Sequence, residues 1–360
     1  MKTVIYGAQG IALGAYNSIK ELFPSCEILC FLVTKLEMNA SSLSGIPVRE
    51  LEEFASECSR EDKDNMQVLI GTPESVMEEI EQSLENFGFY NHVRLDSERW
   101  ADMQRNAFIK NGRFIPLEAY PVGFEPSNLY VYKAKFHSDR KLKTQFTDPD
   151  YITPIQVGAA QTDIRVADVL DSAGDSISDK NGNYSELTAL YWIWKNRLVN
   201  HYYGTDCYYG LNHYRRLLNL SEDDLLRLKD NDIDVILPYP MPYEPDIEEH
   251  HKRYLSDSEW NAVLQALEES QPEYAVAFKD ILKQNYFYNY NIIIAKSNVL
   301  EEYCNWLFPL LFEIEKFNDP NGLKKPNRYM GYIGETLETL YFMYNKNRLR
   351  IAHAGCKFLT

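Results

Sequence analysis

Two motifs separated by a short polar connector decide how the second half of the chain is expected to fold. Residues 174–196 are GDSISDKNGNYSELTALYWIWKN, and residues 207–219 are CYYGLNHYRRLLN. The first motif predicts a polar loop rich in turn-forming residues, followed by an aromatic amphipathic helix. The second predicts a short apolar strand that ends in the basic segment 213–216. Because open α/β sheets bind ligands at the carboxyl ends of their strands, we expect a ligand site at this strand end.

The end of this strand carries positive charge on both of its sides. An extended chain directs His213 and Arg215 to one side and Arg216 to the other. Arginine stays protonated, and its guanidinium can bind phosphate oxygens through two parallel hydrogen bonds. We therefore predict that His213, Arg215 and Arg216 bind an anion. The alternative is that the arginines pair with nearby acids such as Asp223 or Asp224 on a solvated face.

The polar loop before the aromatic helix is expected to form the opposite side of the same anion site. Lys180 and Asn181 are the candidate binding residues in this loop, and Asp175 is a candidate for binding a nucleotide. Glu186 falls in the first turn of the helix, where the helix dipole favours a carboxylate. The preferred interpretation of Glu186 is therefore a helix cap.

A second candidate for nucleotide binding is the end of the extended segment 151–160. Gly158 and Ala159 are small residues, which would let a flat base or a phosphate approach the backbone closely. A simple turn would use the same residues, and the sequence leaves both interpretations open.

The composition is that of a soluble globular protein. The chain has 360 residues, of which 45% are hydrophobic and 25% charged, with a formal net charge of -16. Residues 1–125 contribute -9 and the remaining 235 contribute -7, so neither part resembles a nucleic-acid-binding domain. The six cysteines form no CxxC pair, and we expect reduced thiols and a cytoplasmic location. The first residues predict a strand and not a signal peptide, and no apolar run has the length of a membrane span.

The N-terminal residues predict a βαβ unit. Residues 2–6 are an apolar strand, residues 7–14 contain three glycines, and a helix and a second strand (27–33) follow. This order is typical of nucleotide-binding folds. However, the glycine spacing is GxxGxxxG, and no acidic residue follows the second strand to bind a ribose. Dinucleotide binding and a tight turn with close helix packing both remain open, and the second is favoured.

Further strands and helices alternate to about residue 88, which predicts a small parallel sheet. Pro116, Pro121 and Pro126 indicate a linker. We therefore predict a Rossmann-like domain at 1–126 and a second α/β domain at 127–360. In the second domain, segment 286–295 is expected to be one strand with Asn289 and Asn291 on the same face.

Several motifs of the second domain resemble one protein family. The segments GDSISDKNGNYSELTALYWIWKN, YYGLNHYRRLL, DVILP, YNYNIIIAKSNVLEEYCNWLFPLLFEIE and RYMGYIGETLETLYF occur in this order within residues 128–355. They are similar to a bacterial capsular and exopolysaccharide glycosyltransferase family that was long known only as a domain of unknown function. The resemblance implies a GT-A-like mixed-sheet domain. It also implies transfer of a hexose, with galactosyl and galactofuranosyl units as candidates, from a UDP-sugar to a lipid-linked glycan at the inner membrane face.

The same resemblance suggests how the donor diphosphate is bound. Most GT-A enzymes carry an Asp-x-Asp pair at this strand end, which holds a divalent metal against the diphosphate. Here the segment 212–215 is Asn-His-Tyr-Arg. We predict that His213, Arg215, Arg216 and Lys180 stabilise the diphosphate directly, so that no metal or other cofactor is needed. The adjacent histidines at 250 and 251 do not suit a metal site either, because a regular element cannot aim both at one ion.

An inverting transfer also needs a base for the acceptor hydroxyl. Glu335, near the start of the last long helix, is the first candidate, and Asp257 is the second. A charge at a helix N-terminus is the alternative role for Glu335. Asn289 and Asn291 are the candidate acceptor-binding residues.

Two other functions compete with the transferase. One is an NAD(P)-dependent or sugar-nucleotide-modifying enzyme that uses the N-terminal domain, and the absence of an acidic ribose partner disfavours it. The other is a non-catalytic scaffold for polysaccharide assembly.

Overall fold

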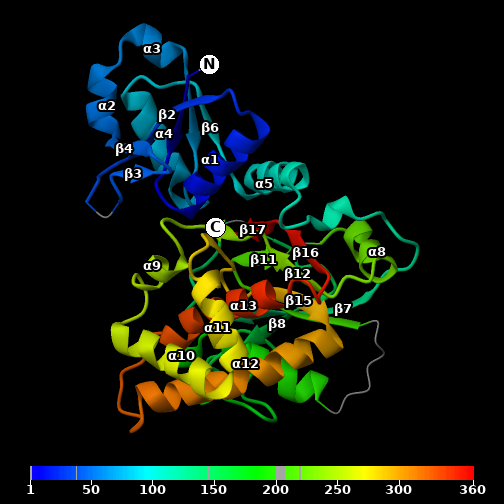
Figure 1. Cartoon of the computed structure of the whole chain (residues 1–360). Coiled ribbons are helices and arrows are strands. Elements are labelled where there is room, and N and C mark those ends of the chain that lie inside the picture. Colours follow the sequence, from blue (N-terminus) through cyan, green and yellow to red (C-terminus); the bar gives the residue numbers. More distant parts are fainter. Residues whose placement is uncertain (1, 38, 144–145, 200–206, 219) are drawn as a thin grey trace.

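The computed structural model describes residues 2–37, 39–143, 146–199, 207–218 and 220–360. The connector 200–206 and Asn219, which belong to the motif region discussed above, lie outside the described residues. The strands form two main sheets, and the chain passes from one to the other between residues 94 and 128 (Figure 1). This change of sheet is compatible with the predicted domain boundary near residue 126, which remains a prediction.

The first sheet is parallel except for one edge hairpin, as the alternation of strands and helices predicted. Its strands, in spatial order, are β3 (Ser42–Leu43), β4 (Ile46–Glu50), β2 (Glu27–Val33), β1 (Lys2–Tyr6), β5 (Met66–Ile70) and β6 (His92–Arg94). Its helices are α1 (Gly10–Leu22), α2 (Leu51–Glu57), α3 (Arg60–Asp64), α4 (Met77–Asn86) and α5 (Ser97–Asn111), with a 3-10 turn η1 (Glu74–Val76). Ile5 packs towards α1 and α5, whereas Val4 and Tyr6 pack towards α2 and α4. The sheet is therefore covered on both faces, which explains its continuous apolar strands.

The second sheet is mixed. Its spatial order is β16 (Ile351–Ala354), β12 (Val235–Pro238), β15 (Ile293–Lys296), β10 (Cys207–His213), β7 (Asn128–Lys135), β8 (Ile152–Gln156) and β9 (Val169–Leu170). Strand β15 runs antiparallel to both of its neighbours, whereas β10, β7, β8 and β9 are parallel. β11 (Arg216–Leu218) pairs with β10 and β17 (Cys356–Phe358), and β13 (Met241–Pro242) forms a separate pair with β14 (Tyr286–Phe287).

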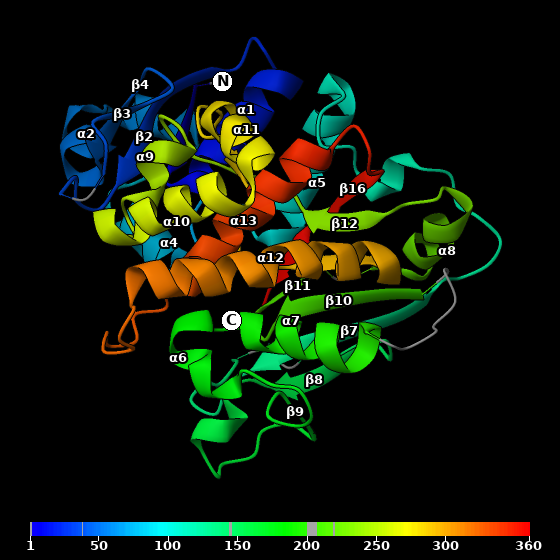
Figure 2. The same ribbon diagram turned by 60° about the horizontal axis from the view of Figure 1, so that its bottom comes forward.

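Most helices of the second half gather on one face of this sheet (Figure 2). The helices are α6 (Asn181–Tyr184), α7 (Leu187–Ile193), α8 (Glu222–Asp230), α9 (Ile247–His251), α10 (Asp257–Ser270), α11 (Pro272–Ile281), α12 (Ser297–Asn318) and α13 (Tyr329–Asn345). Shorter turns are η2 (Leu117–Ala119), η3 (Ala159–Gln161), η4 (Ser178–Lys180) and a π-helix at Trp194–Leu198. Of the helices that the structure describes, none is long and apolar enough to cross a membrane.

The aromatic helix of the 174–196 motif belongs to the core, as predicted. Trp194 stacks on Phe308 of α12 with ring centroids 5.3 Å apart, and Tyr191 contacts the same ring edge-on at 5.1 Å. Because these rings are buried between α7 and α12, they fix the position of the loop that precedes α7.

The predicted single strand 286–295 is wrong. The chain forms β14, leaves the extended conformation and resumes it only at Ile293. Tyr290 (φ 78°) and Asn291 (φ 49°) both adopt the left-handed conformation. Two successive residues in this conformation end the alternation of a strand, and Asn289 and Asn291 therefore have different surroundings.

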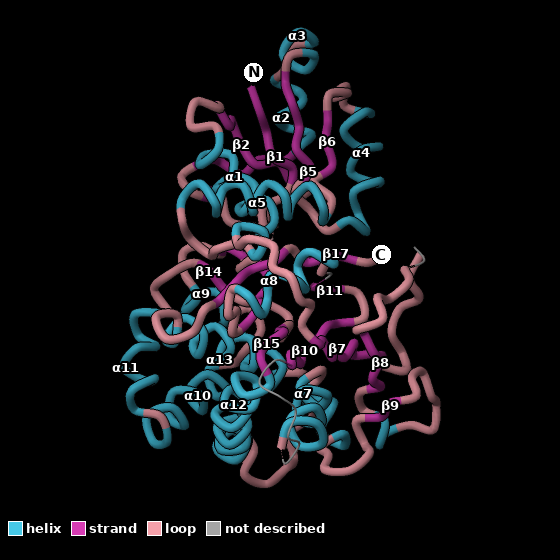
Figure 3. The backbone as a smooth tube through the Cα atoms, turned by 90° about the vertical axis from the view of Figure 1, so that its right-hand side faces the viewer, coloured by secondary structure: helices cyan, strands magenta, loops and turns pink. Residues whose placement is uncertain are grey.

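The two sheets are joined by a shared apolar contact. Figure 3 shows α1 and α5 at the base of the first sheet, next to the second. Met241 and Tyr243 pack into the same hydrophobic cluster as α1 and Trp100. A Cβ placed on Gly10 would lie 2.9 Å from the Met241 Cε. The glycine of α1 thus allows close contact with the second half of the chain.

Candidate active site

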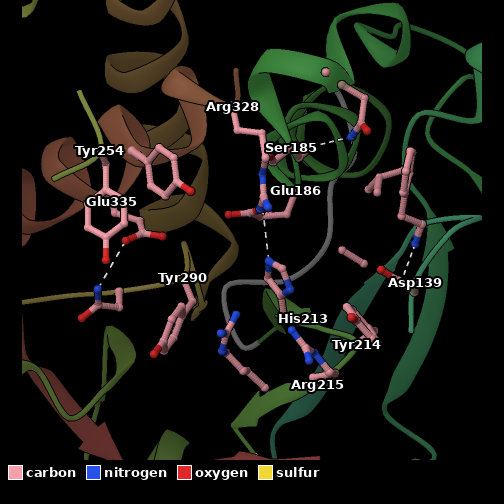
Figure 4. A pocket seen from close by; sticks show the side chains of 18 of the residues that line it. Asp139, Ser185, Glu186, His213, Tyr214, Arg215, Tyr254, Tyr290, Arg328 and Glu335 are labelled. Carbon is pink, nitrogen blue, oxygen red and sulfur yellow. Dashed lines mark hydrogen bonds and ion pairs between the residues drawn. The ribbon is translucent and has the colours of Figure 1, made fainter. Parts of the chain in front are cut away.

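A cleft of about 570 Å³ opens at the carboxyl ends of β7, β8 and β10, where the strand pattern predicted a ligand site. Strand ends, the loop before α7 and the first turns of α13 all contribute to it (Figure 4). The lining residues are Ala134, Phe136, Asp139, Val157, Asn181, Gly182, Ser185, Glu186, His213, Tyr214, Arg215, Arg216, Tyr243, Tyr254, Asn289, Tyr290, Arg328, Tyr332 and Glu335.

Three arginines give the cleft its positive charge. Arg215 and Arg216 lie in the tight turn from β10 to β11, and Arg328 precedes α13. Within the described residues none of the three forms an ion pair. The Arg216 guanidinium lies 3.9 Å from the centroid of the Tyr290 ring, and Arg328 Nε donates to Ser185 Oγ at 3.2 Å. These guanidiniums are oriented by uncharged neighbours, so their charge is available to an anionic ligand.

A buried carboxylate holds the histidine of the same strand end. Glu186 is 5% exposed, and its Oε2 lies 3.1 Å from His213 Nε2. Asn291 Nδ2 donates to Glu186 Oε1 at 2.7 Å and to the Gly331 carbonyl at 3.0 Å. Burial alone would raise the pKa of Glu186, but the charge of His213 and hydrogen bonds from His213 and Asn291 lower it to about 2. Glu186 is the N-cap residue of α7, as expected, but its side chain makes no capping hydrogen bond and instead orients His213.

The second carboxylate of the cleft has the opposite environment. Glu335 lies in the second turn of α13 and accepts a hydrogen bond from Asn289 Nδ2 at 3.4 Å. Burial, and then the negative charge of Glu186, raise the pKa of Glu335 to about 8. A carboxyl group with this pKa can exchange a proton near neutral pH.

Tyrosines surround Glu335 and form an aromatic side of the cleft. Tyr254 stacks on Tyr332 with ring centroids 4.7 Å apart, and the Tyr243 hydroxyl donates to Asn289 Oδ1 at 3.4 Å. In Figure 4, Glu335, Tyr254 and Tyr290 lie together, apart from Arg215 and His213. The cleft therefore has a cationic side and an aromatic side that carries the titratable carboxyl, and the two sides meet where Arg216 stacks on Tyr290.

Backbone strain gathers at this cleft. Seven non-glycine residues in the described part of the chain have positive φ, and four of them line the cleft or lie directly behind it: Ser185, Tyr290, Asn291 and Arg328. Such conformations cost roughly 1–3 kcal/mol each and persist where surrounding contacts impose them. Their concentration here indicates that the cleft is a functional site.

The structure brings six of the twelve predicted site residues together. His213, Arg215, Arg216, Asn181, Asn289 and Glu335 line the cleft. Asn291 lies behind the cleft wall, where it holds Glu186. Its expected role as an acceptor-binding residue is corrected to a supporting one, because its amide nitrogen donates to Glu186 and to the Gly331 carbonyl.

Three charged candidates lie outside the cleft lining. Lys180 pairs with Glu315 of α12, with 2.5 Å between Nζ and Oε2. Asp175 accepts a hydrogen bond from the Tyr191 hydroxyl at 3.0 Å. Asp257 is exposed at the start of α10. The structure therefore does not support donor binding by Lys180 or Asp175, or proton transfer by Asp257.

The backbone proposed to approach a nucleotide is occupied by another side chain. Asp171 is fully buried and accepts from the Gly158 N–H at 2.9 Å and from the Ala159 N–H at 3.0 Å. The Thr188 hydroxyl donates to the same carboxylate at 2.6 Å. Of the two interpretations left open, the contacts favour a structural turn after β8, which Asp171 ties to Thr188 of α7.

The glycine turn after β1 also has a structural explanation. Gly7 has φ 123°, and a Cβ on it would lie 2.5 Å from the Gly71 carbonyl oxygen, so the turn requires glycine. The segment around Met241 packs against Gly10, next to this turn. Tight packing was the favoured interpretation, and these contacts agree with it.

Sequence reasoning missed several lining residues, including Asp139, Tyr254 and Arg328. Arg328 is the first residue of the RYMGYIGE segment, in which Glu335 is the only predicted site residue. The Asp139 carboxylate accepts from the Phe136 N–H at 2.7 Å, and burial raises its pKa. No local signal distinguishes Asp139 from other acids in the loops of this chain.

Comparison with solved structures shows that the fold occurs in another protein. No curated protein matches the chain. Among solved structures, the apo structure of the WbbM bifunctional glycosyltransferase is similar, with a TM-score of 0.54 and 24% sequence identity. The similarity covers 65% of this chain and 45% of the other, so this chain spans less than half of that protein. At this identity the likeness shows a shared fold.

A protein-family model matches residues 135–347, which contain all but one of the cleft residues. The matched region is more than half of the chain. The chain therefore belongs to the family described as Domain of unknown function (DUF4422).

Proposed function

We propose that the chain is a glycosyltransferase that moves a hexose from a UDP-sugar to a glycan acceptor. One observation carries the proposal: a single cleft combines three arginines free of ion pairs with a carboxyl group, Glu335, whose pKa is raised to about 8. The first feature suits a diphosphate, and the second suits a general base. The fold shared with WbbM, a bifunctional glycosyltransferase by its name, supports the proposal.

The two sides of the cleft would divide the reaction. The donor diphosphate lies against Arg215, Arg216 and Arg328, and the sugar points towards the tyrosines. Glu335, once deprotonated, takes the proton of the acceptor hydroxyl. The acceptor oxygen then forms a bond to the anomeric carbon while the bond to the diphosphate breaks, and UDP leaves with the electron pair. The guanidiniums stabilise the negative charge that develops on the leaving group.

Two of the three carboxylates of the cleft are already engaged by the protein, which supports a reaction without a divalent metal. Glu186 is engaged by His213 and Asn291, and Asp139 accepts from the backbone. In the part of the chain that the structure describes, no group of three or more His, Cys, Asp or Glu residues could hold a metal ion. We therefore propose that arginine replaces the metal in binding the diphosphate.

The finer assignments follow from the sequence motifs. We propose a hexose donor, with galactosyl and galactofuranosyl units as first candidates, and a lipid-linked acceptor in capsular or exopolysaccharide synthesis. Such an acceptor places the reaction at the cytoplasmic face of the inner membrane. Residues 1–126 would form a Rossmann-like domain attached to a GT-A-like transferase domain at 127–360.

A ligand panel tests the proposed function. Thermal unfolding is followed with UDP, UDP-galactose, UDP-glucose, NAD and NADP, each with Mn²⁺ or with EDTA. We expect UDP and at least one UDP-sugar to raise the Tm in EDTA, and NAD and NADP to leave it unchanged. Stabilisation by NAD or NADP alone would favour the oxidoreductase, and no stabilisation by any nucleotide would favour a scaffold. Strict dependence on Mn²⁺ would overturn the proposed metal independence.

A further inference from the structure

A second cavity lies between the two sheets. Its volume is about 230 Å³, and its walls include Gln9 and Ser42 from the first sheet and Tyr243, Glu244 and Arg253 from the second half of the chain. Tyr243 lines both this cavity and the transfer cleft. The residue after Arg253 is Tyr254 of the cleft wall. The two cavities therefore lie on either side of one aromatic side chain.

The polar side chains of the second cavity are held in place across the interface. Arg253 Nη1 donates to Gln9 Oε1, and Gln9 Nε2 donates to Asn39 Oδ1 at 2.9 Å. The Ser44 N–H donates to Glu244 Oε2 at 2.8 Å. A site whose groups are already oriented loses less entropy when a ligand binds. Hydrogen bonds between the two halves of the chain thus orient the polar groups of the cavity.

The chemistry of the cavity suits a sugar. The Ser42 hydroxyl, the remaining N–H groups of Arg253 and the second lone pairs of the Glu244 oxygens supply donors and acceptors for sugar hydroxyl groups. Pro242 and Leu43 supply apolar surface for the C–H face of a sugar ring, and Tyr243, whose ring stacks on His250 with centroids 3.6 Å apart, also lines the cavity. The volume is below the roughly 300–1,000 Å³ of sites for drug-sized ligands, which suits one sugar unit and is too small for a dinucleotide.

The position of the cavity indicates which substrate would reach it. Tyr254 lies beside Glu335 (Figure 4), and Tyr243 donates to Asn289, which in turn donates to Glu335, so both tyrosines belong to the side of the cleft that carries Glu335. In the proposed reaction this side receives the acceptor, because Glu335 takes the acceptor proton. An acceptor longer than one sugar would therefore extend past Tyr243 towards the first sheet.

We propose that the cavity between the sheets binds the second sugar of an oligosaccharide acceptor, so that the N-terminal sheet completes the acceptor site. This proposal rests on the proposed transferase function. The substrate class that it assigns is an acceptor of at least two sugars. It also gives the N-terminal residues a role in acceptor binding, which the glycine turn after β1 did not indicate.

Binding of matched acceptors tests the proposal in the full-length protein. Octyl glycosides of galactose, glucose and mannose are compared with the corresponding homodisaccharide glycosides by calorimetry in the presence of UDP. We expect at least one disaccharide to bind about tenfold more tightly than its monosaccharide. Ser42→Trp, which fills the cavity, and Arg253→Met, which removes a donor, should abolish this advantage. Val276→Trp, a change at a position that is 70% exposed on α11, should retain it.

The outcomes separate the two proposals. If no disaccharide binds better than its monosaccharide, or if the advantage survives in both cavity variants, the cavity proposal is overturned. If wild-type protein binds neither UDP nor a UDP-sugar, the transferase proposal fails, and the disaccharide comparison without UDP still decides the cavity. Each variant is first checked for an unchanged Tm, and Arg253→Met alone is sufficient if Ser42→Trp does not fold.

Discussion

Glu186 and Glu335 are two carboxyl groups of one cleft whose surroundings move their pKa values in opposite directions. His213 and Asn291 stabilise the charged form of Glu186, whereas burial and the charge of Glu186 destabilise the charged form of Glu335. Two carboxyl groups with such different pKa values are typical of catalytic sites in which one group stays ionised and the other exchanges a proton. This division supports Glu335 as the base and Glu186 as a permanent anion.

The role of Glu335 predicts a large loss of activity in Glu335→Gln. Sugar transfer from UDP-galactose should fall by about 10²–10⁴-fold, because the amide cannot accept the proton. The Kd of UDP should stay within about twofold, since Glu335 does not belong to the cationic side. Asp257→Asn is the matched control, and full activity is expected from it. An Asp257 variant that is inactive, or a Glu335 variant that is active, would contradict the assignment.

The same substitution should change how stability depends on pH. The pKa of Glu335 is about 8 in the folded protein, against 4.5 for an ordinary Glu. Between these values the folded state binds more protons than the unfolded chain, so stability falls as the pH rises. The slope is at most roughly 1.4 kcal/mol per pH unit. Tm measured at pH 6 and pH 9 should fall less in Glu335→Gln than in wild type, and equal slopes would refute the raised pKa.

Removing the charge of Glu186 should destabilise the fold. Glu186→Gln leaves His213 and Asn291 without their anionic partner in a buried position, and such a loss costs roughly 3–5 kcal/mol. Glu315→Gln breaks the more exposed pair with Lys180 and should cost about 0–1 kcal/mol. Urea unfolding measures both variants. Similar costs for the two would show that the Glu186–His213 contact does not contribute in this way.

At the scale of elements, the turn from β10 to β11 explains how the arginines are presented. His213 pairs with Arg216 across the turn, and β11 also pairs with the C-terminal strand β17. The turn is therefore held on one side by the central parallel strands and on the other by the C-terminal strand. A rigid turn places two guanidiniums at the edge of the sheet with little loss of entropy on binding.

This turn predicts the salt dependence of ligand binding. Arg216→Met keeps the side chain length but removes one charged donor, for a loss of roughly 1.5–3 kcal/mol. The Kd of UDP should rise by about 10- to 150-fold, and binding should become less sensitive to salt. Arg350→Met, which changes an exposed arginine that does not line the cleft, is the control. Isothermal titration at two salt concentrations measures both, and unchanged UDP affinity in Arg216→Met would place the diphosphate elsewhere.

At the scale of the whole molecule, the two sheets share one apolar cluster. Met241 and Tyr243 from the second half pack with Ala12, Leu13 and Trp100 of the first. Because the aromatic wall of the cleft begins at Tyr243, the position of the first sheet affects the acceptor side of the cleft. An apolar contact between two halves of a chain favours a fixed arrangement.

The shared cluster predicts that the two halves unfold together. Differential scanning calorimetry of the full chain should show a single transition, with equal calorimetric and van't Hoff enthalpies. The reason is that unfolding either sheet alone would expose the apolar surface of its partner. Met241→Asp places a charge in the cluster and should separate the transition into two. Two transitions in the wild-type protein would show that the contact between the sheets is weak.

Local patterns in the sequence determined a large part of this protein. The apolar period of the first 94 residues specified a parallel sheet, because strands buried on both faces need continuous apolar runs. The helical spacing of apolar and aromatic residues in the 174–196 motif specified a core helix. The basic residues after an apolar strand, and Glu335 near the start of a helix, lie in one cleft as expected, since strand ends and helix starts meet at the same edge of a sheet.

Only the tertiary structure decided which groups are already engaged and which remain available. Glu186 and Asn291 are 105 residues apart in the chain, and their hydrogen bond exists because α13 packs beside α7. The Asp171 carboxylate accepts the hydrogen bond of the Gly158 N–H, and Glu315 forms an ion pair with Lys180. The sequence shows the hydrophobic periodicity and the charges along the chain. Which side chains form hydrogen bonds or ion pairs depends on distances that only tertiary packing determines. For this reason the cationic strand end was predictable, and the partner of each charge was not.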